Sequence, residues 1–230
     1  LLLLVLDGSG PGRTRRPALD YLPYGAGLAV YLGLRVMSVE HGQGIVANAA
    51  VPLGFRLLTM AEVVVRYLAL VVAPLDLHME RVVAPVASPF EPGALAALVA
   101  VAALIAGALW ARARAWPVTL GVAWFLVALL PVANVVPLAT FMAEHWLYVP
   151  LMGLCLAAGW GGEQLAHDGW RRPVVIAIAI VVAVYGGLTI RQNLAWRDGR
   201  TLYGYLLPLA PESLRVRVNL AQAYQEAGDL

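Results

Sequence analysis

The sequence is short of the charged residues that soluble domains have on their surfaces. Only 13% of its 230 residues are charged, whereas 61% are hydrophobic and the mean hydropathy is +0.75. Roughly a quarter of the residues in soluble domains are charged. A soluble domain of this length could not bury so many apolar residues in its core. The composition therefore predicts an all-α protein that crosses a membrane several times.

Lysine is absent, and all 16 basic residues are arginine. These arginines are spread along the chain rather than gathered in a polybasic block, and the formal net charge is only +2. Nucleic acid is therefore excluded as an expected partner. Together with the abundance of Ala, Val, Gly and Arg, the missing lysine indicates a GC-rich bacterial genome, and we expect the protein in a bacterial inner membrane.

Several chemical motifs are also missing. The chain has one cysteine, Cys155, so neither an internal disulfide nor a multi-cysteine metal site is possible. It has no Gly-rich phosphate loop, no Gly-x-Ser-x-Gly elbow and no His-Glu-x-x-His pair, which mark soluble nucleotide-binding, hydrolase and zinc enzymes. Arg35 is the only ionisable residue within the predicted membrane spans, which disfavours an ion-coupled transporter.

Five apolar segments are predicted to cross the bilayer, since a spanning helix needs about 20 apolar residues. They are Tyr21–Val39, Gly93–Ala111, Ala115–Ala143, Trp146–Gly162 and Pro173–Ile190. The third is long enough for a span plus a re-entrant or interfacial tail. The apolar run at Leu1 indicates the end of a helix that begins upstream. The sequence thus predicts a partial transmembrane domain over residues 1–190.

Arginines in the short loops predict the orientation, because basic residues are retained on the cytoplasmic side. They lie in alternate loops that must share one face, at Arg13, Arg15, Arg16, Arg112, Arg114, Arg171 and Arg172. This face is predicted to be cytoplasmic. Loops 40–92 and 134–145, with everything after Ile190, are then extracytoplasmic.

The long loop 40–92 contains a predicted helix from Gly54 to Ala73, ended by Pro74. Its polar residues recur at spacings of three, three and four, at Arg56, Thr59, Glu62 and Arg66. This spacing places them on one stripe of an otherwise apolar helix. Such a helix is better suited to lying in the membrane interface than to crossing the bilayer.

Residues 191–230 are predicted to form an extracytoplasmic linker helix and half of a tetratricopeptide repeat. Leu220, Ala221, Tyr224 and Gly228 match the spacing of the first helix of such a repeat. One half-repeat cannot bury its own apolar face, because these units are stable in stacks. We therefore expect the start of an α-solenoid, with further repeats after Leu230.

Candidate binding residues lie in the predicted external segments. Glu144 and His145 are the only ionisable pair between two long apolar runs, and could contact a phosphate-bearing substrate at the bilayer edge or anchor the next span. Arg56 and Arg66 could bind an anionic headgroup through the forked guanidinium. Alternatively, Arg66 pairs with Glu62 on the helix surface.

A second polar cluster follows Pro74 and comprises Asp76, His78, Glu80 and Arg81. Its mixed side chains could perform acid–base chemistry or bind a divalent metal. A solvated loop is the simpler interpretation.

Five short segments of the sequence follow one another in a characteristic order. They are Arg56-Leu-Leu-Thr-Met, Arg66-Tyr67-Leu68, Pro74-Leu75-Asp76-Leu77, Glu144-His145-Trp146-Leu147-Tyr148-Val149-Pro150 and Trp196-Arg197-Asp198, followed by the repeat start. This order resembles the TMTC-type membrane proteins, which are O-mannosyltransferase-like enzymes of the GT-C fold with trailing tetratricopeptide repeats. The family often has Arg after the glutamate and Ser after the proline, where this chain has His145 and Leu151.

The resemblance implies that the chain is the back half of a GT-C-like membrane domain. It implies transfer of a sugar, mannose in the family, from a polyprenyl-phosphate carrier to a protein hydroxyl on the extracytoplasmic face. Arg56 and Arg66 would then lie near the carrier phosphate, and Glu144, His145 and Tyr148 would shape the site. A divalent metal is a candidate cofactor, without assigned ligands.

In the enzymes that the chain resembles, the acidic catalytic residues lie in the first external loop. That loop is expected upstream of Leu1, so the chain alone is expected to be inactive. The alternative is a non-enzymatic membrane scaffold whose repeats recruit partner proteins.

Overall fold

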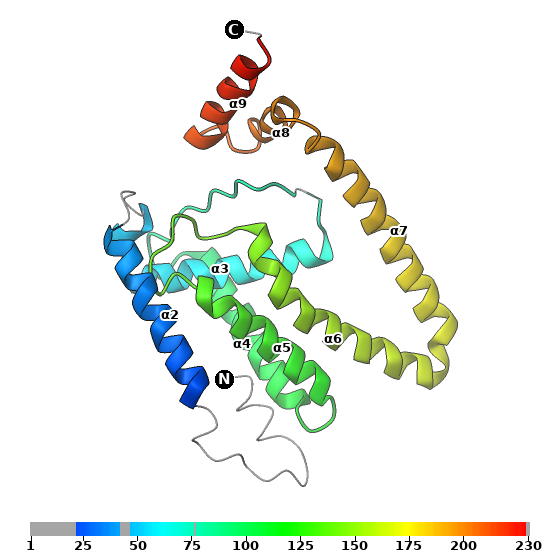
Figure 1. Cartoon of the computed structure of the whole chain (residues 1–230). Coiled ribbons are helices and arrows are strands. Elements are labelled where there is room, and N and C mark those ends of the chain that lie inside the picture. The colour runs from blue at the N-terminus through cyan, green and yellow to red at the C-terminus, as the bar shows by residue number, and fades with distance from the viewer. Residues whose placement is uncertain (1–21, 42–46, 76, 229–230) are drawn as a thin grey trace.

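A computed structural model describes residues 22–41, 47–75 and 77–228, and within these ranges every regular element is a helix (Figure 1). This confirms the predicted all-α class. The longer helices are α2 (Leu22–His41), α3 (Leu53–Val72), α4 (Pro92–Ala111), α5 (Trp116–Leu129), α6 (Tyr148–Leu165), α7 (Arg171–Ala195), α8 (Gly199–Leu206) and α9 (Leu214–Glu226). The short elements are η2 (Ala47–Ala50), η3 (Leu130–Val132), η4 (Glu144–Leu147) and η5 (Ala166–Trp170). The predicted helix end at Leu1 lies outside the described residues.

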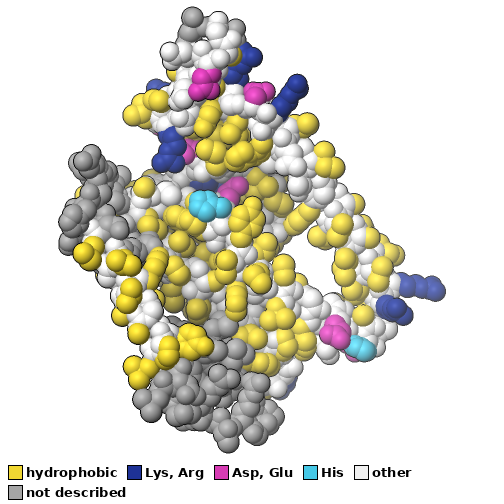
Figure 2. All heavy atoms as spheres, viewed as in Figure 1, with side chains coloured by type: hydrophobic (Ala, Val, Ile, Leu, Met, Phe, Trp, Pro, Cys, Tyr) yellow, Lys and Arg dark blue, Asp and Glu magenta, His cyan; other side chains and the backbone are white. Residues whose placement is uncertain are grey.

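Within the described ranges, two helical stretches are long and apolar enough to cross a membrane. They are α4 and the 52-residue stretch Glu144–Ala195, which includes α6 and α7. Only 11% of the apolar window of α4 is buried, and none of the window in the longer stretch. Figure 2 shows hydrophobic side chains exposed along α7. Apolar helices exposed in this way are unfavourable in water and suited to lipid, so they support a membrane protein.

The five predicted spans do not all appear as separate, full-length helices. The helices α6 and α7 belong to one continuous stretch that turns back at Gly169, whose φ of 93° favours glycine. The helix α5 ends at Leu129, shortly before Pro131, which lacks a backbone N–H. After Val132 the chain is irregular as far as residue 143. The number of membrane crossings stays a prediction.

The helix α3 lies across the upper ends of α4 and α5 in Figure 1. Most of its buried residues lie three or four positions from another one and therefore share one face. The buried residues are Arg56, Thr59, Met60, Ala61, Val63 and Tyr67. This face contributes to the main hydrophobic core with Val83, Phe125, Leu129, Phe141 and Met142. The core therefore joins α3 to the end of α5 and to the irregular segments before α4 and before η4.

The residues of the polar stripe predicted on α3 are divided between the buried core and the surface. Arg56 and Thr59 are buried in the core, whereas Arg66 is exposed. The Thr59 hydroxyl donates to the carbonyl of Phe55 at 2.8 Å and accepts from the backbone N–H of Val86 at 2.9 Å. Half of the stripe thus satisfies buried backbone groups, which would be unfavourable if left unpaired.

Two glycines allow α5 and α6 to approach closely. A Cβ atom at Gly121 would overlap the carbonyl oxygen of Gly153, and a Cβ atom at Gly153 would overlap that of Gly121. Trp124 adds a hydrogen bond from its indole N–H to the carbonyl of Val149 at 2.8 Å. Small residues at a helix contact are typical of helices that pack in membranes.

The C-terminal helices α8 and α9 form a small unit at the end of α7 (Figure 1). The carboxylate of Asp198 caps α8 by accepting from the Thr201 N–H at 2.8 Å, and this hydrogen bond lowers the pKa of Asp198. Ser213 caps α9. Gly228 follows α9 with a left-handed φ of 76°, as expected of a glycine in a turn. The assignment of α9 to a tetratricopeptide repeat stays a prediction.

Replacement of Gly121 by valine should separate α5 from α6. The new side chain would overlap the backbone of Gly153, and overpacking of this kind costs about 1–3 kcal/mol of stability. Thermal unfolding in detergent would measure the loss. Gly159→Val is the matched control, because a Cβ atom at Gly159 meets nothing within 4 Å. Equal losses in the two variants would contradict the close α5–α6 contact.

Candidate functional site

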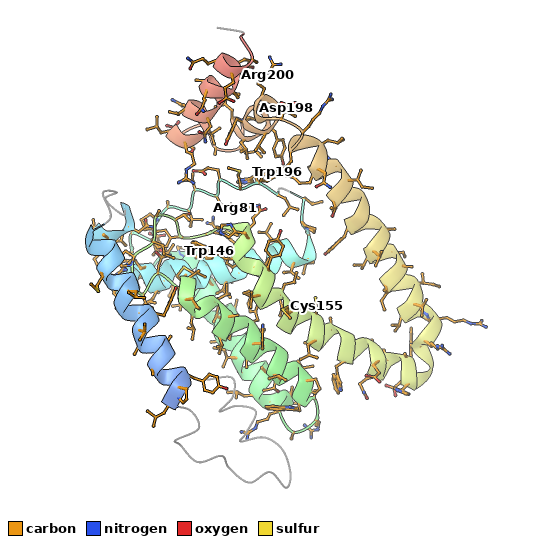
Figure 3. The ribbon with its side chains drawn as sticks, viewed as in Figure 1. Arg81, Trp146, Cys155, Trp196, Asp198 and Arg200 are labelled. Atoms are coloured by element: carbon orange, nitrogen blue, oxygen red, sulfur yellow. The ribbon has the colours of Figure 1, made fainter. Side chains whose placement is uncertain are left out.

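Glu144 lies where η4 meets the segment between α3 and α4. Its side chain is 22% exposed, and that of its partner Arg81 is 18% exposed. Figure 3 shows Arg81 and Trp146 at this junction, near the start of α6, with Cys155 further along the same helix. The junction lies at the end of the apolar helices that is nearer to α8 and α9 (Figure 1).

One oxygen of Glu144 accepts three hydrogen bonds. Its Oε1 accepts from Arg81 Nη2 at 2.7 Å, from Arg81 Nε at 2.9 Å and from the backbone N–H of His78 at 2.8 Å. Hydrogen bonds between ionised partners are short and strong, and this pair is only partly exposed to water. The carboxylate of Glu144 therefore fixes the loop that contains His78 and Arg81.

Tyr67 of α3 hydrogen-bonds to the backbone of Ala143, the residue before Glu144. Its hydroxyl donates to the carbonyl of Ala143 at 2.9 Å and accepts from the N–H of the same residue at 3.2 Å. The Tyr67 side chain is fully buried, and this burial raises its pKa to about 12. The phenol thus stays neutral and keeps Glu144 in a fixed position relative to α3.

Arg56 serves a structural role in this arrangement. Its Nη1 donates to the carbonyls of Asn134 at 2.8 Å and Val135 at 3.2 Å. Asn134 has a positive φ of 54°, which asparagine tolerates better than most residues, and its side chain accepts from the Leu138 N–H at 3.0 Å. Arg56 therefore stabilises a turn in the irregular segment before η4, and its buried side chain does not point to solvent as a headgroup ligand would.

Arg66 is placed differently. Its side chain is 51% exposed and lies 3.7 Å from the carboxylate of Glu62, one helical turn earlier. The structure thus contains the surface pair that the sequence offered as the alternative. Since Arg56 is buried and lies ten residues away, about 15 Å along the helix axis, the two arginines do not form one anion site.

His145 and Tyr148 are exposed beside Glu144. The imidazole of His145 stacks edge-on against the ring of Trp146, with centroids 5.8 Å apart. The side chain of Tyr148 is 75% exposed at the first residue of α6. Both residues are therefore accessible near the Glu144 carboxylate, but neither has a contact that assigns it a chemical role.

The second polar cluster predicted after Pro74 is divided by the structure. His78 and Arg81 contact Glu144, whereas Glu80 points to the C-terminal helices, and Asp76 lies outside the described residues. Within the described ranges, no three His, Cys, Asp or Glu side chains gather in a way that could hold a metal ion. A divalent metal thus finds no ligand set in this part of the chain.

Three residues of the junction were missed by sequence reasoning or received no specific partner. Arg81 was placed in a polar cluster without a link to Glu144, and Tyr67 and Asn134 were given no role. The only available signal was the charge of Arg81, opposite in sign to that of the single glutamate in the predicted external loop 134–145. The hydroxyl of Tyr67 and the left-handed backbone of Asn134 have no signature in a single sequence.

Comparison with known proteins finds partial similarity to curated proteins of Drosophila melanogaster. The chain is 30% identical to the protein O-mannosyl-transferase Tmtc3 over 109 residues, which are 46% of this chain and 12% of that protein. It is 34% identical to Tmtc1 over 98 residues, or 40% of this chain and 11% of that protein, and 27% identical to Tmtc2 over 104 residues, or 44% and 11%.

These matches support the resemblance to TMTC-type proteins in part. The matched stretch covers only about a tenth of each relative's length. No family model matches the chain, and no solved structure matches it either.

Replacement of Arg81 by alanine should destabilise the junction. Glu144 would keep only the hydrogen bond from His78, and hydrogen bonds to charged groups contribute about 1.5–3 kcal/mol. Arg66→Ala is the matched control, because its exposed ion pair should contribute at most about 1 kcal/mol. Chemical unfolding of both variants measures the difference. A loss with Arg81→Ala no greater than with Arg66→Ala would contradict the assigned geometry.

The raised pKa of Tyr67 predicts a pH dependence of stability. Since the folded value is about 12 and the ordinary value is 10.0, the contribution is fully present below about pH 10 and is lost as pH rises towards 12. Unfolding midpoints of the wild type and Tyr67→Phe, measured from pH 9 upwards, should converge over this range. Tyr148→Phe controls for an exposed tyrosine. A constant difference between wild type and Tyr67→Phe would refute the burial argument.

Proposed function

We propose that the chain is part of a membrane glycosyltransferase that moves a mannose-like sugar from a polyprenyl-phosphate carrier to protein hydroxyls outside the cytoplasm. The observation that supports this most is the similarity to three relatives that are each named protein O-mannosyl-transferase. The chain would supply the back half of a GT-C-like membrane domain and the first helices of an extracytoplasmic repeat array.

The placement of the arginines supports an orientation. Arg112 and Arg114 follow α4, Arg171 and Arg172 begin α7, and both turns lie at the end of the helices away from α9 (Figure 1). Figure 2 shows charged side chains gathered at the turn between α6 and α7. Because arginines are retained in the cytoplasm, Glu144 and α8–α9 would face the outside, in bacteria the outer side of the inner membrane.

Four side chains are candidates for contact with the sugar or its carrier in this proposal. The carboxylate of Glu144 is 22% exposed and could accept a hydrogen bond from a sugar hydroxyl. His145 and Tyr148 are exposed beside it. Arg66 is exposed on α3, one residue before Tyr67, and a helix in the interface would present its guanidinium to a lipid phosphate. Arg56 is not retained as a carrier ligand, because the carbonyls of Asn134 and Val135 occupy its Nη1.

The proposed reaction assigns no catalytic base to this chain. The acceptor hydroxyl oxygen attacks the anomeric carbon of the sugar, the bond from that carbon to the phosphate oxygen breaks, and the phosphate leaves on the carrier. The proton of the hydroxyl passes to an acidic residue outside this chain. The residues of this chain would bind and orient the donor.

A transfer assay tests this function. The protein that contains this chain, purified in detergent, is mixed with tritiated polyprenyl-phosphate mannose and with envelope proteins from cells that lack it. We expect labelled protein, and a loss of at least about tenfold in the rate with Glu144→Gln, equivalent to about 1.4 kcal/mol. Arg66→Ala should raise the KM for the donor, since it removes a carrier contact.

Tyr203→Phe, in α8 and remote from Glu144, is the control and should transfer normally. No labelling by the wild type would refute the enzyme and favour a membrane scaffold that binds partners through repeats. Normal transfer by both Glu144→Gln and Arg66→Ala would refute the assigned substrate contacts.

A further inference from the structure

We infer that residues Leu77–Arg81, which we call the strap, hold α8 and α9 in a fixed position relative to Glu144. Within the strap, Arg81 and the backbone N–H of His78 contact the candidate site, whereas Glu80 and the carbonyl of Leu77 contact the C-terminal helices. Glu80 is assigned as a positioning residue, because it acts through Arg81 and touches neither reacting group. The expected effect of this link on transfer to acceptor proteins rests on the proposed function. The link between α9 and Glu144 itself does not.

Glu80 connects the strap to the first turn of α9. Its Oε1 accepts from the hydroxyl of Ser213 at 3.0 Å, and its Oε2 lies 3.4 Å from Nη1 of Arg215. Ser213 is buried and also caps α9. Its hydroxyl oxygen accepts a hydrogen bond from the backbone N–H of Val216 at 3.3 Å. A carboxylate beside a helix N-terminus is favoured by the exposed N–H groups there.

The carbonyl of Leu77 connects the strap to two further helices. It accepts from Nε2 of Gln192 in α7 at 2.9 Å and from the hydroxyl of Tyr205 in α8 at 3.1 Å. The carbonyl of Leu77 and the carboxylate of Glu80 thus accept hydrogen bonds from side chains of α7, α8 and the start of α9. These contacts join segments more than one hundred residues apart in the sequence.

The remaining groups of the strap face the candidate site. Arg81 and the backbone N–H of His78 donate to Glu144, and the carbonyl of Arg81 lies 3.4 Å from the hydroxyl of Thr140. Glu80 and Arg81 are consecutive, so their Cα atoms are about 3.8 Å apart. A shift of α9 that moves Glu80 would therefore also move Arg81 relative to Glu144. The position of α9 and the geometry of Glu144 are therefore coupled.

Hydrogen–deuterium exchange tests the link without any assay of activity. The protein containing this chain is placed in lipid nanodiscs, and Glu80→Ala is compared with Glu91→Ala. Glu91 is the matched control, because it accepts from the N–H groups of Ala87 and Ser88 in the same segment and has no contact with α9. We expect Glu80→Ala to speed exchange at residues 77–81, 144–148 and 214–226, and Glu91→Ala to speed it only near residues 87–91.

Faster exchange confined to residues 77–81, or unchanged exchange at 144–148, would overturn the inference. Arg215→Ala and Glu80→Gln are milder variants that keep the test valid if Glu80→Ala fails to fold. Arg215→Ala should speed exchange in the same three regions, to a smaller extent, because the Ser213 contact remains.

The consequence for catalysis is tested with two acceptors. With Glu80→Gln we expect kcat/KM for a large protein acceptor to fall about tenfold. For a serine-containing peptide too short to reach α9 we expect a smaller fall, because only the geometry of Glu144 is disturbed there. Equal losses with both acceptors, or no loss with either, would overturn the positioning role. If the wild type transfers no sugar, the proposed function fails, and the exchange experiment still decides whether the strap links α9 to Glu144.

Discussion

The rest of the junction depends on the hydrogen bonds that Glu144 accepts from the strap. A partly buried carboxylate is unfavourable unless it accepts hydrogen bonds, and the donors to Glu144 come from residues 63 and 66 positions earlier. This pairing brings the start of α6 to the segment that follows α3. Tyr67 fixes Ala143 beside it, and Arg56 stabilises the turn at Asn134. The polar contacts of the junction therefore gather at one end of a bundle whose long sides are apolar.

This arrangement separates two environments within one short chain. The helices α4, α6 and α7 expose hydrophobic side chains over most of their length, as expected of segments in contact with lipid. Above them, α3 and the irregular segments enclose the main core, and α8 and α9 form a second, smaller core around Leu206 and Val216. The strap lies between the two cores, where a change in one unit can be transmitted to the other.

The sequence predicted the features that depend on local patterns. Apolar runs such as Gly93–Ala111 are visible in composition, and a helix was expected near residues 54–73, where α3 is found. Glu144 was chosen because it lies between long apolar runs. Its partner was not predicted, because the contact with Arg81 spans 63 residues and single-sequence periodicity holds no information at that distance. Arg56 was placed at the carrier phosphate by its charge alone, whereas its buried guanidinium binds backbone carbonyls.

The central claim is that the end of the bundle at Glu144 is where the lipid-linked sugar binds. A cryo-EM structure of the protein that contains this chain, in nanodiscs with a polyprenyl phosphate, would locate the phosphate directly. We expect phosphate density beside Arg66, at the same end of the bundle as Glu144, α8 and α9. Phosphate density at the opposite end, beside Arg112 and Arg171, would contradict it.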